Sequence, residues 1–299
     1  MHPRQNCGQG GIGEALVAEY ARQGLYAIAT VLPSEPSDHL SGPRISCFTL
    51  DVTCEQSIAD LYQKVTALTG GYLDVMVNNA GICYTMTAID SDVHEIQKMF
   101  DVNVFGPMRM VHRFHNVLIA ARGTIVNIGS VGGIVPFLYG SSYNATKAAL
   151  HHWSNTLRVE MKPFKVHVIT VISGEIGTNI LLRDQGANRE LPEGIKMPRV
   201  YVGASTKFAG SYYSPLAAEF KQHIQRIPKT TSRFMYAERV VSESLKKSPT
   251  AWLWYGMTTS LVRFFDIFGF RTVWDYIFWG WFNLGKLRKV HQQQAPYAN

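Results

Sequence analysis

Cysteine is scarce in this chain of 299 residues, which contains only four. They stand at positions 7, 47, 54 and 83, and they form neither a CxxC pair nor a His/Cys cluster at metal-ligand spacing. This distribution argues against a disulfide framework and against a zinc site. We therefore expect a protein of a reducing, cytoplasmic compartment with no bound metal.

The amino end also lacks the apolar core of a secretory signal, since residues 1–6 read Met-His-Pro-Arg-Gln-Asn. The net charge is +7, yet lysine and arginine are dispersed and no nucleic-acid-binding motif is present. We expect no nucleic-acid partner. A mildly basic surface would suit a phosphate-bearing cofactor or an anionic membrane.

Apolar runs alternate with segments of helical period along most of the chain. The strand candidates are residues 26–31, 45–50, 75–77, 124–128, 166–172 and 252–255. The helical candidates are residues 13–23, 54–68, 93–115, 143–162 and 237–247. This alternation predicts an α/β fold with a Rossmann-type, doubly wound parallel sheet.

We expect a single domain over residues 1–256, followed by an aromatic, mildly basic extension over residues 257–299. Residues 201–227 are rich in Gly, Ser, Tyr and Phe and fall between the last two strands of the expected sheet. This segment is predicted to be a mobile substrate lid.

The extension begins in an aromatic stretch, residues 252–282, that holds five of the six tryptophans. Four charges interrupt the stretch and argue against a bilayer-spanning helix: Arg263, Asp266, Arg271 and Asp275. Two interpretations stay open, aromatic packing over the sheet, the substrate mouth or another subunit, and interfacial membrane binding. Three cations after the stretch favour an anionic membrane surface: Lys286, Arg288 and Lys289.

A glycine-rich turn, Gly8-Gln-Gly-Gly-Ile-Gly13, precedes the first helical candidate. Glycines let the backbone approach a pyrophosphate at the positive amino end of a helix. Such turns are also common without a ligand, so this motif alone is weak evidence for a dinucleotide site.

Further polar residues stand where strand candidates end. Residues 75–81 end in Asn-Asn-Ala-Gly, and Ser130 closes the run that begins at 124, at the sheet edge where ligands bind in open α/β folds. Tyr143 and Lys147 are separated by four residues, so they share one helix face and the ammonium can favour the phenolate. Each residue alone has an ordinary structural explanation, but the combined spacing indicates an active site.

Together these motifs resemble the short-chain dehydrogenase/reductase family over about residues 7–256. The resemblance implies that Ser130, Tyr143, Lys147 and Asn103 are catalytic. Tyr143 would donate a proton to the substrate carbonyl while Ser130 holds the oxygen. Lys147 would lower the pKa of the tyrosine and bind the nicotinamide ribose, and Asn103 would support a water chain. The neighbouring His151 and His152 are expected to be packing or surface residues.

The resemblance also implies a set of cofactor-binding residues: Gly11, Ile12, Gly13, Asp51, Asn79, Tyr143, Lys147, Ile176 and Thr178. The spelling of the glycine turn and the aromatic tail are most similar to fungal 1-acyldihydroxyacetone-phosphate reductase-like members and their relatives in secondary metabolism. That similarity implies NADP. NAD stays an alternative, because Leu32 after the 26–31 strand supplies neither an arginine nor a carboxylate.

The expected reaction is the reduction of a ketone to a secondary alcohol, or its reverse. An aromatic lid and tail favour a bulky apolar or acyl-bearing substrate. A homo-oligomer and peripheral contact with the endoplasmic reticulum or lipid droplets are further expectations from the resemblance and the tail.

The amino end departs from the family, which has a buried first strand ending in Thr-Gly. We expect this central strand to be missing from the sheet, which would uncover backbone groups of two neighbours and leave a gap in the core. Either the coding sequence continues upstream of Met1, or the protein is a degenerate member. A non-catalytic binding or assembly partner is therefore the alternative function. Epimerases with the same Tyr-Lys pair are a third candidate, although their domains are larger.

Overall fold

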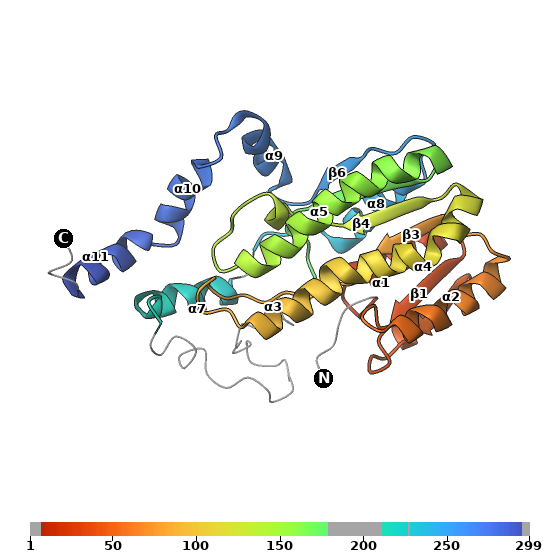
Figure 1. Cartoon of the computed structure of the whole chain (residues 1–299), viewed down its shortest axis with the longest axis horizontal. Coiled ribbons are helices and arrows are strands. Elements are labelled where there is room, and N and C mark those ends of the chain that lie inside the picture. The colour runs from red at the N-terminus through yellow and green to blue at the C-terminus, as the bar shows by residue number, and fades with distance from the viewer. Residues whose placement is uncertain (1–6, 179–210, 227, 295–299) are drawn as a thin grey trace.

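The computed structural model describes residues 7–178, 211–226 and 228–294 (Figure 1). Its strands are parallel and lie between layers of helices, so the predicted α/β class is correct. The strands are β1 Ala27–Val31, β2 Ile45–Thr49, β3 Val75–Asn78, β4 Thr124–Ile128, β5 His167–Ser173 and β6 Trp252–Tyr255.

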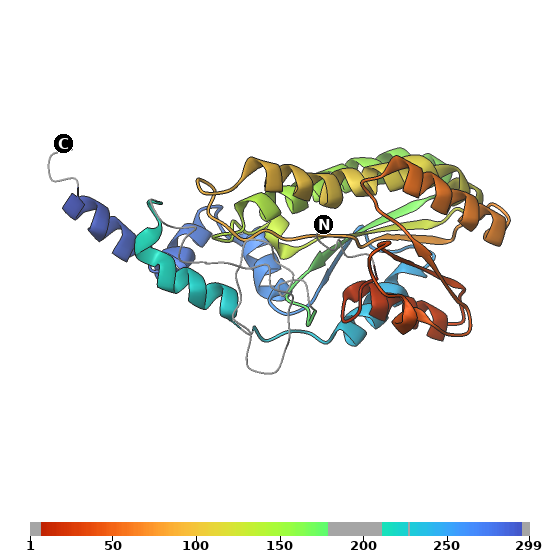
Figure 2. The same cartoon turned by 90° about the horizontal axis from the view of Figure 1, so that it is seen from below.

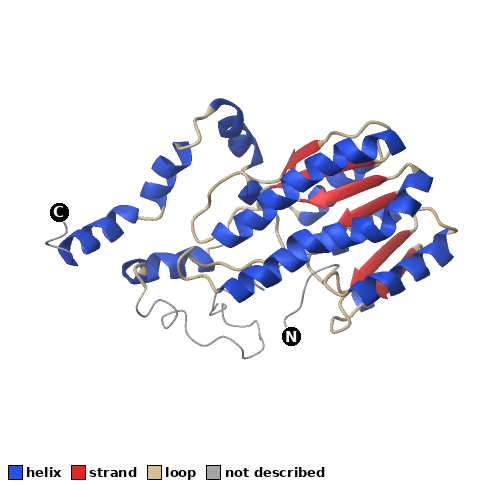
Figure 3. Ribbon diagram, in the orientation of Figure 1, coloured by secondary structure: helices blue, strands red, loops and turns tan. Residues whose placement is uncertain are grey.

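Helices cover both faces of the sheet (Figures 2 and 3). On one face lie α2 Glu55–Thr69, α3 Val93–Phe100, α4 Gly106–Ala121 and α5 Ser141–Met161. The other face is covered by α1 Ile12–Arg22 and α8 Arg233–Ser244, which pack against each other. This two-sided cover explains why every residue of β4 is buried and why β5 reads as a nearly continuous apolar run.

The sheet is divided into two parts. Strands β1 and β2 form a pair, and β3, β4, β5 and β6 form a second parallel sheet in that order. Within the residues that the structure describes, no strand lies between β1 and β3, in agreement with the expected lack of a first strand. All the strands nevertheless direct their carboxyl ends to the same side of the molecule (Figure 3).

The helix predicted over residues 93–115 is present, but it contains a π turn and continues to Ala121. The chain forms α3, then one π-helical turn at Asp101–Phe105, and then α4, which continues to Ala121. Pro107 lies at the start of α4 and has no backbone N–H to donate to a preceding carbonyl. A widened turn before it accommodates that loss, and such turns frequently mark functional sites.

The predicted lid is only partly within the described residues. Its last portion forms a short 3₁₀ turn at Ser214–Leu216 and α7 Ala217–Gln225, whereas residues 201–210 and 227 lie outside them. Phe220 and Ile224 of α7 are buried in a cluster that also contains Tyr139. The described part of this segment is therefore packed against the loop that precedes α5.

Three helices follow β6: α9 Thr259–Phe268, α10 Val273–Trp281 and α11 Leu284–Gln294. They extend from one end of the molecule as an arm (Figure 1). Phe278 and Phe282 anchor this arm by edge-to-face contacts with Phe137 at 5.3 and 5.5 Å between ring centroids. Among the described helices, none is long and apolar enough to cross a membrane.

Candidate active site

Ser130, Tyr143 and Lys147 meet at the carboxyl end of β4. Ser130 follows the strand by two residues, and its hydroxyl accepts a 3.0 Å hydrogen bond from the Gly132 amide. Tyr143, from the first turn of α5, lies close to it, since a Cβ on Gly132 would contact both the Ser130 hydroxyl and the Tyr143 ring. One helical turn later, the Lys147 ammonium lies 5.7 Å from the Tyr143 ring centroid and donates a 2.8 Å hydrogen bond to the Ile128 carbonyl. The residues that the sequence separates by up to 17 positions thus form one cluster.

Burial controls the protonation of this cluster. It raises the pKa of Tyr143 well above its ordinary value, and the neighbouring Ser130 opposes that rise only in part. Burial also lowers the pKa of Lys147 to about 8. The predicted lowering of the tyrosine pKa is therefore not what the structure shows. The phenol holds its proton firmly, and the ammonium loses its proton more readily than an exposed lysine would.

Asn103 lies in the π-helical turn between α3 and α4 and is buried. Its amide donates to the Ile82 carbonyl at 2.9 Å and to the Thr146 hydroxyl at 3.1 Å, and its Oδ1 accepts from the Ile82 amide at 2.9 Å. Asn103 therefore joins the loop after β3 to α5, next to Lys147. A Cβ on Gly81 would lie 3.5 Å from Asn103 Oδ1, so the loop passes close to this side chain.

His151 belongs to the same cluster, although we predicted a packing or surface residue at this position. Its Nε2 accepts a 3.2 Å hydrogen bond from the backbone amide of Ser130. Burial, with a smaller contribution from Lys147, lowers its pKa to about 3, so the ring is neutral at ordinary pH. A Cβ on Gly129 or on Gly133 would come within 2.4 Å of the ring. Two features of the sequence could have identified His151 as part of the site: these two glycines, and its position four residues after Lys147.

The glycine turn lies directly before α1, with Gly11 at the N-cap and no side chain capping it. Gly10 has a φ of 76°, in the left-handed region that glycine adopts without strain. The Gly10 amide donates a 2.7 Å hydrogen bond to the carboxylate of Glu14. The amide groups at the start of α1, where Ile12 and Gly13 lie, suit an anionic pyrophosphate. Glu14 is a neighbouring negative charge that was not among the predicted site residues.

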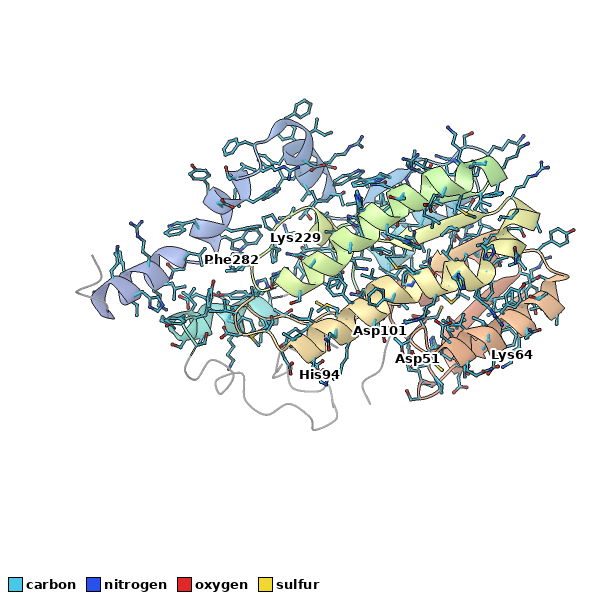
Figure 4. The ribbon with its side chains drawn as sticks, viewed as in Figure 1. Asp51, Lys64, His94, Asp101, Lys229 and Phe282 are labelled. Carbon is cyan, nitrogen blue, oxygen red and sulfur yellow. The ribbon has the colours of Figure 1, made fainter. Side chains whose placement is uncertain are left out.

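Other predicted cofactor residues also lie at the carboxyl ends of strands. Asp51 follows β2 (Figure 4), and its Oδ1 accepts hydrogen bonds from the amide and hydroxyl of Thr53 at 2.9 and 2.7 Å. Asn79 directly follows β3. Beyond β5, Ile176 forms an isolated bridge with Thr231, and Thr178 is the last described residue of this loop. The parallel sheet therefore places these positions along the same edge as Ser130.

His39 was not predicted from the sequence. It lies on the 3₁₀ turn Asp38–Leu40, and its Nε2 is 2.8 Å from the carbonyl oxygen of Cys7, directly before the glycine turn. A histidine near this turn is a candidate contact for the adenosine half of a dinucleotide. Among the described residues, no group of three or more His, Cys, Asp or Glu side chains could hold a metal ion.

The chain is similar to known dehydrogenases over most of its length. The profile of the short chain dehydrogenase family matches residues 7–187. The short-chain dehydrogenase virD of Hypocrea virens is 62% identical over 285 residues, which cover 95% of this chain and 93% of that protein. The NADPH-dependent 1-acyldihydroxyacetone phosphate reductase of Schizosaccharomyces pombe is 40% identical, over 62% of this chain and 64% of that protein.

The solved structures include a short-chain dehydrogenase from Streptomyces avermitilis with a TM-score of 0.67 and 25% identity. The similarity covers 90% of this chain and 93% of that chain. The fold and the sequence comparisons therefore indicate the same family.

Proposed function

This chain belongs to the short-chain dehydrogenase family, and we propose from this premise that it reduces a ketone to a secondary alcohol with NADPH. The observation that carries the proposal is the position of the Lys147 ammonium, 5.7 Å from the Tyr143 ring centroid and bonded to the Ile128 carbonyl at the end of β4, with Ser130 two residues after that strand. An acid, an oxygen-binding hydroxyl and a cation at one strand end are the groups that carbonyl reduction requires.

In this proposal Tyr143 donates its proton to the carbonyl oxygen as the oxygen becomes an alkoxide. The raised pKa of the phenol keeps the proton in place until that charge develops. Ser130 holds the oxygen by a hydrogen bond. Lys147 supplies positive charge when protonated, and Asn103 fixes the helix that carries it. Bound NADPH would supply the hydride.

The glycine turn, the amino end of α1 and residues Asp51, Asn79, Ile176 and Thr178 would hold the dinucleotide. NADP is the proposed cofactor because the S. pombe relative is named as NADPH-dependent. No arginine follows β1 at Leu32, and His39, which lies beside the Cys7 carbonyl before the glycine turn, is the proposed contact with the ribose phosphate. Titrating NADPH and NADH against tryptophan fluorescence tests this assignment, and tighter binding of NADH would refute it.

The proposed substrate is a bulky apolar or acyl-bearing ketone, as in lipid or secondary metabolism. Apolar and aromatic side chains near the site support it: Tyr84, Met86, Val135, Tyr139, Phe220 and Phe282. We propose that residues 1–256 carry the reaction and that residues 257–299 form a separate extension.

The decisive experiment compares wild type with Tyr143→Phe on a panel of ketones that includes a long-chain acyl dihydroxyacetone phosphate. Turnover should fall about 100- to 10,000-fold, as expected on losing an acid–base group, while NADPH affinity stays the same. His152→Phe on the same helix is the matched control and should leave turnover near the wild-type value. Near-normal turnover of Tyr143→Phe would refute the mechanism.

The divided sheet favours a second candidate function, a non-catalytic binding or assembly protein. It predicts cofactor binding without turnover on any ketone, so the same panel separates the two functions. We also propose that the chain forms a homo-oligomer. Analytical sedimentation of the same samples would measure this self-association.

We further propose peripheral contact with an anionic membrane, such as the endoplasmic reticulum or a lipid droplet. Phe268 and Tyr276 are each 75% exposed on the arm, and Phe264, Phe270 and Trp281 are also exposed. Rings and cations together favour an anionic interface. Co-sedimentation with phosphatidylserine vesicles should decrease on changing Phe268 and Tyr276 to serine, and unchanged binding would contradict this.

A further inference from the structure

Glu14 bonds a backbone amide that the glycine turn would otherwise offer to a phosphate. It stands in the first turn of α1, and its Oε2 accepts a 2.7 Å hydrogen bond from the Gly10 amide. The positive end of the helix dipole stabilises this carboxylate as it would stabilise a phosphate. Two anions cannot share one amide, because like charges in contact repel each other. A phosphate that uses the Gly10 amide must therefore displace the carboxylate of Glu14.

Arg233 lies where the displaced carboxylate can go. It is the first residue of α8, which packs against α1, and its Nη2 is 3.9 Å from Glu14 Oε2. That separation is longer than a hydrogen bond, so the two charges are close but not bonded. Two residues before Arg233, Thr231 forms a bridge with Ile176, a proposed cofactor residue. Arg233 is therefore close to both the glycine turn and the loop after β5.

One edge of the Arg233 guanidinium is open to a carboxylate. Its Nε is buried and has no hydrogen-bond partner in the described part of the chain. Its face is occupied by the Phe234 ring, whose centroid lies 4.6 Å from Cζ. Nε and Nη2 form an edge that binds a carboxylate through two parallel hydrogen bonds. Arg22 shows this arrangement in the same molecule, because its Nε and Nη2 donate to the two carboxylate oxygens of Glu19 at 2.6 and 2.7 Å.

We propose that Glu14 and Arg233 form an exchange pair that sets the affinity of the glycine turn for the diphosphate of the dinucleotide. When a phosphate oxygen takes the Gly10 amide, the Glu14 carboxylate moves to the Nε and Nη2 edge of Arg233. The ion pair neutralises Glu14 and removes a like charge from beside the diphosphate. Neither residue touches the reacting atoms, so both are positioning residues. Their role in the enzyme rests on the proposed function, because it presupposes that the turn binds NADPH.

The first test measures the Kd of NADPH for the full chain and its variants by tryptophan fluorescence. Glu14→Gln keeps the size of the side chain but removes the competing charge, so it should bind NADPH about tenfold more tightly. Arg233→Met leaves Glu14 without its second position and should bind about tenfold more weakly. Glu238→Gln, which removes the same charge from an exposed position on α8, is the matched control and should leave Kd unchanged. Unchanged or weaker binding by Glu14→Gln would overturn the proposal.

The double variant separates exchange from a direct contact between Arg233 and the cofactor. Once Glu14 is changed to glutamine, Arg233 has no carboxylate to neutralise. The loss caused by Arg233→Met should then fall from about tenfold to less than about twofold. A direct contact with a phosphate would cost the same factor in both backgrounds, and that result would overturn the exchange. Should Arg233→Met not fold, Arg233→Lys replaces it, since lysine keeps the charge but lacks the planar fork.

Inorganic pyrophosphate is the second probe, because it carries the two phosphates without the nicotinamide. Calorimetric titration should give the same order of affinities, with Glu14→Gln tightest and Arg233→Met weakest. If pyrophosphate shows this order but NADPH does not bind the wild type, the exchange pair stands and the proposed reductase function fails. If NADPH is bound and turned over but wild type and all variants share one Kd, the exchange pair is wrong and the proposed function stands. The absence of pyrophosphate binding by both wild type and Glu14→Gln would also overturn the exchange pair.

Discussion

Burial of the Lys147 ammonium lowers the stability of the folded protein, whereas the proposed reaction needs its positive charge at the site. Its pKa falls from 10.5 to about 8 because burial disfavours the ammonium, which corresponds to a cost of about 3 kcal/mol. The folded pKa is the lower one, so between about pH 8 and 10.5 the unfolded chain binds more protons. Stability should rise with pH across that window, and the full penalty applies below pH 8.

We therefore predict that Lys147→Met is more stable than wild type at pH 7 and nearly inactive. Their difference in unfolding free energy should shrink between pH 8 and 10.5, because the wild-type penalty disappears there. Urea denaturation at several pH values measures it. Lys64→Met on the outer side of α2 (Figure 4) is the control and should show no such trend. A constant difference between Lys147→Met and wild type would contradict the prediction.

His151 acts on Ser130 rather than on substrate, so it is a positioning residue. We predict that His151→Met lowers kcat about tenfold and leaves KM nearly unchanged, because loss of the acceptor frees the Ser130 backbone. His151→Gln places an amide oxygen near the same point and should recover part of kcat.

A purely structural role for His151 would give a different pattern, with both variants destabilised and with no recovery of kcat by glutamine. Acid stability gives a second measurement. The folded pKa of about 3 lies below the ordinary 6.5, so wild type should lose stability as the pH falls from 6.5 toward 3. His151→Met should lack that part of the loss.

The local sequence pattern correctly predicted the helices and strands whose structure depends mainly on local sequence. The buried run Thr124–Ile128 was assigned correctly because a strand covered on both faces is apolar throughout. The helix over 93–115 was also assigned correctly as helix, but its π turn was not predicted, because that turn before Pro107 depends on one missing backbone donor, which hydrophobic period does not register. Spacing likewise predicted Ser130, Tyr143 and Lys147 as a group.

Two residues, His39 and His151, were not predicted as site residues because their roles depend on contacts between segments that are distant in the sequence. His39 reaches the Cys7 carbonyl over 32 positions, and His151 reaches the Ser130 amide over 21. Neither contact follows a helical or strand period. The raised pKa of Tyr143 was missed for a related reason, because spacing identifies the cation nearby but does not measure the burial that outweighs it.

For the whole molecule, the two parts of the sheet should differ in stability. β4 has strands on both sides and is buried throughout, whereas β1, among the strands that the structure describes, is paired only with β2 and borders a cavity of about 600 Å³. A two-stranded sheet is marginal by itself, and local opening follows the sparse packing. The shared helix pair α1 and α8 links the parts without joining their strands.

We predict that amides of β1 which bond β2, such as Ala27, exchange with deuterium at least about tenfold faster than amides in β5, such as Thr170. Hydrogen exchange with mass spectrometry measures both segments in one sample, so solution conditions cancel. Equal protection of β1 and β5 in the free protein would show that helix packing alone makes the divided sheet a single cooperative unit.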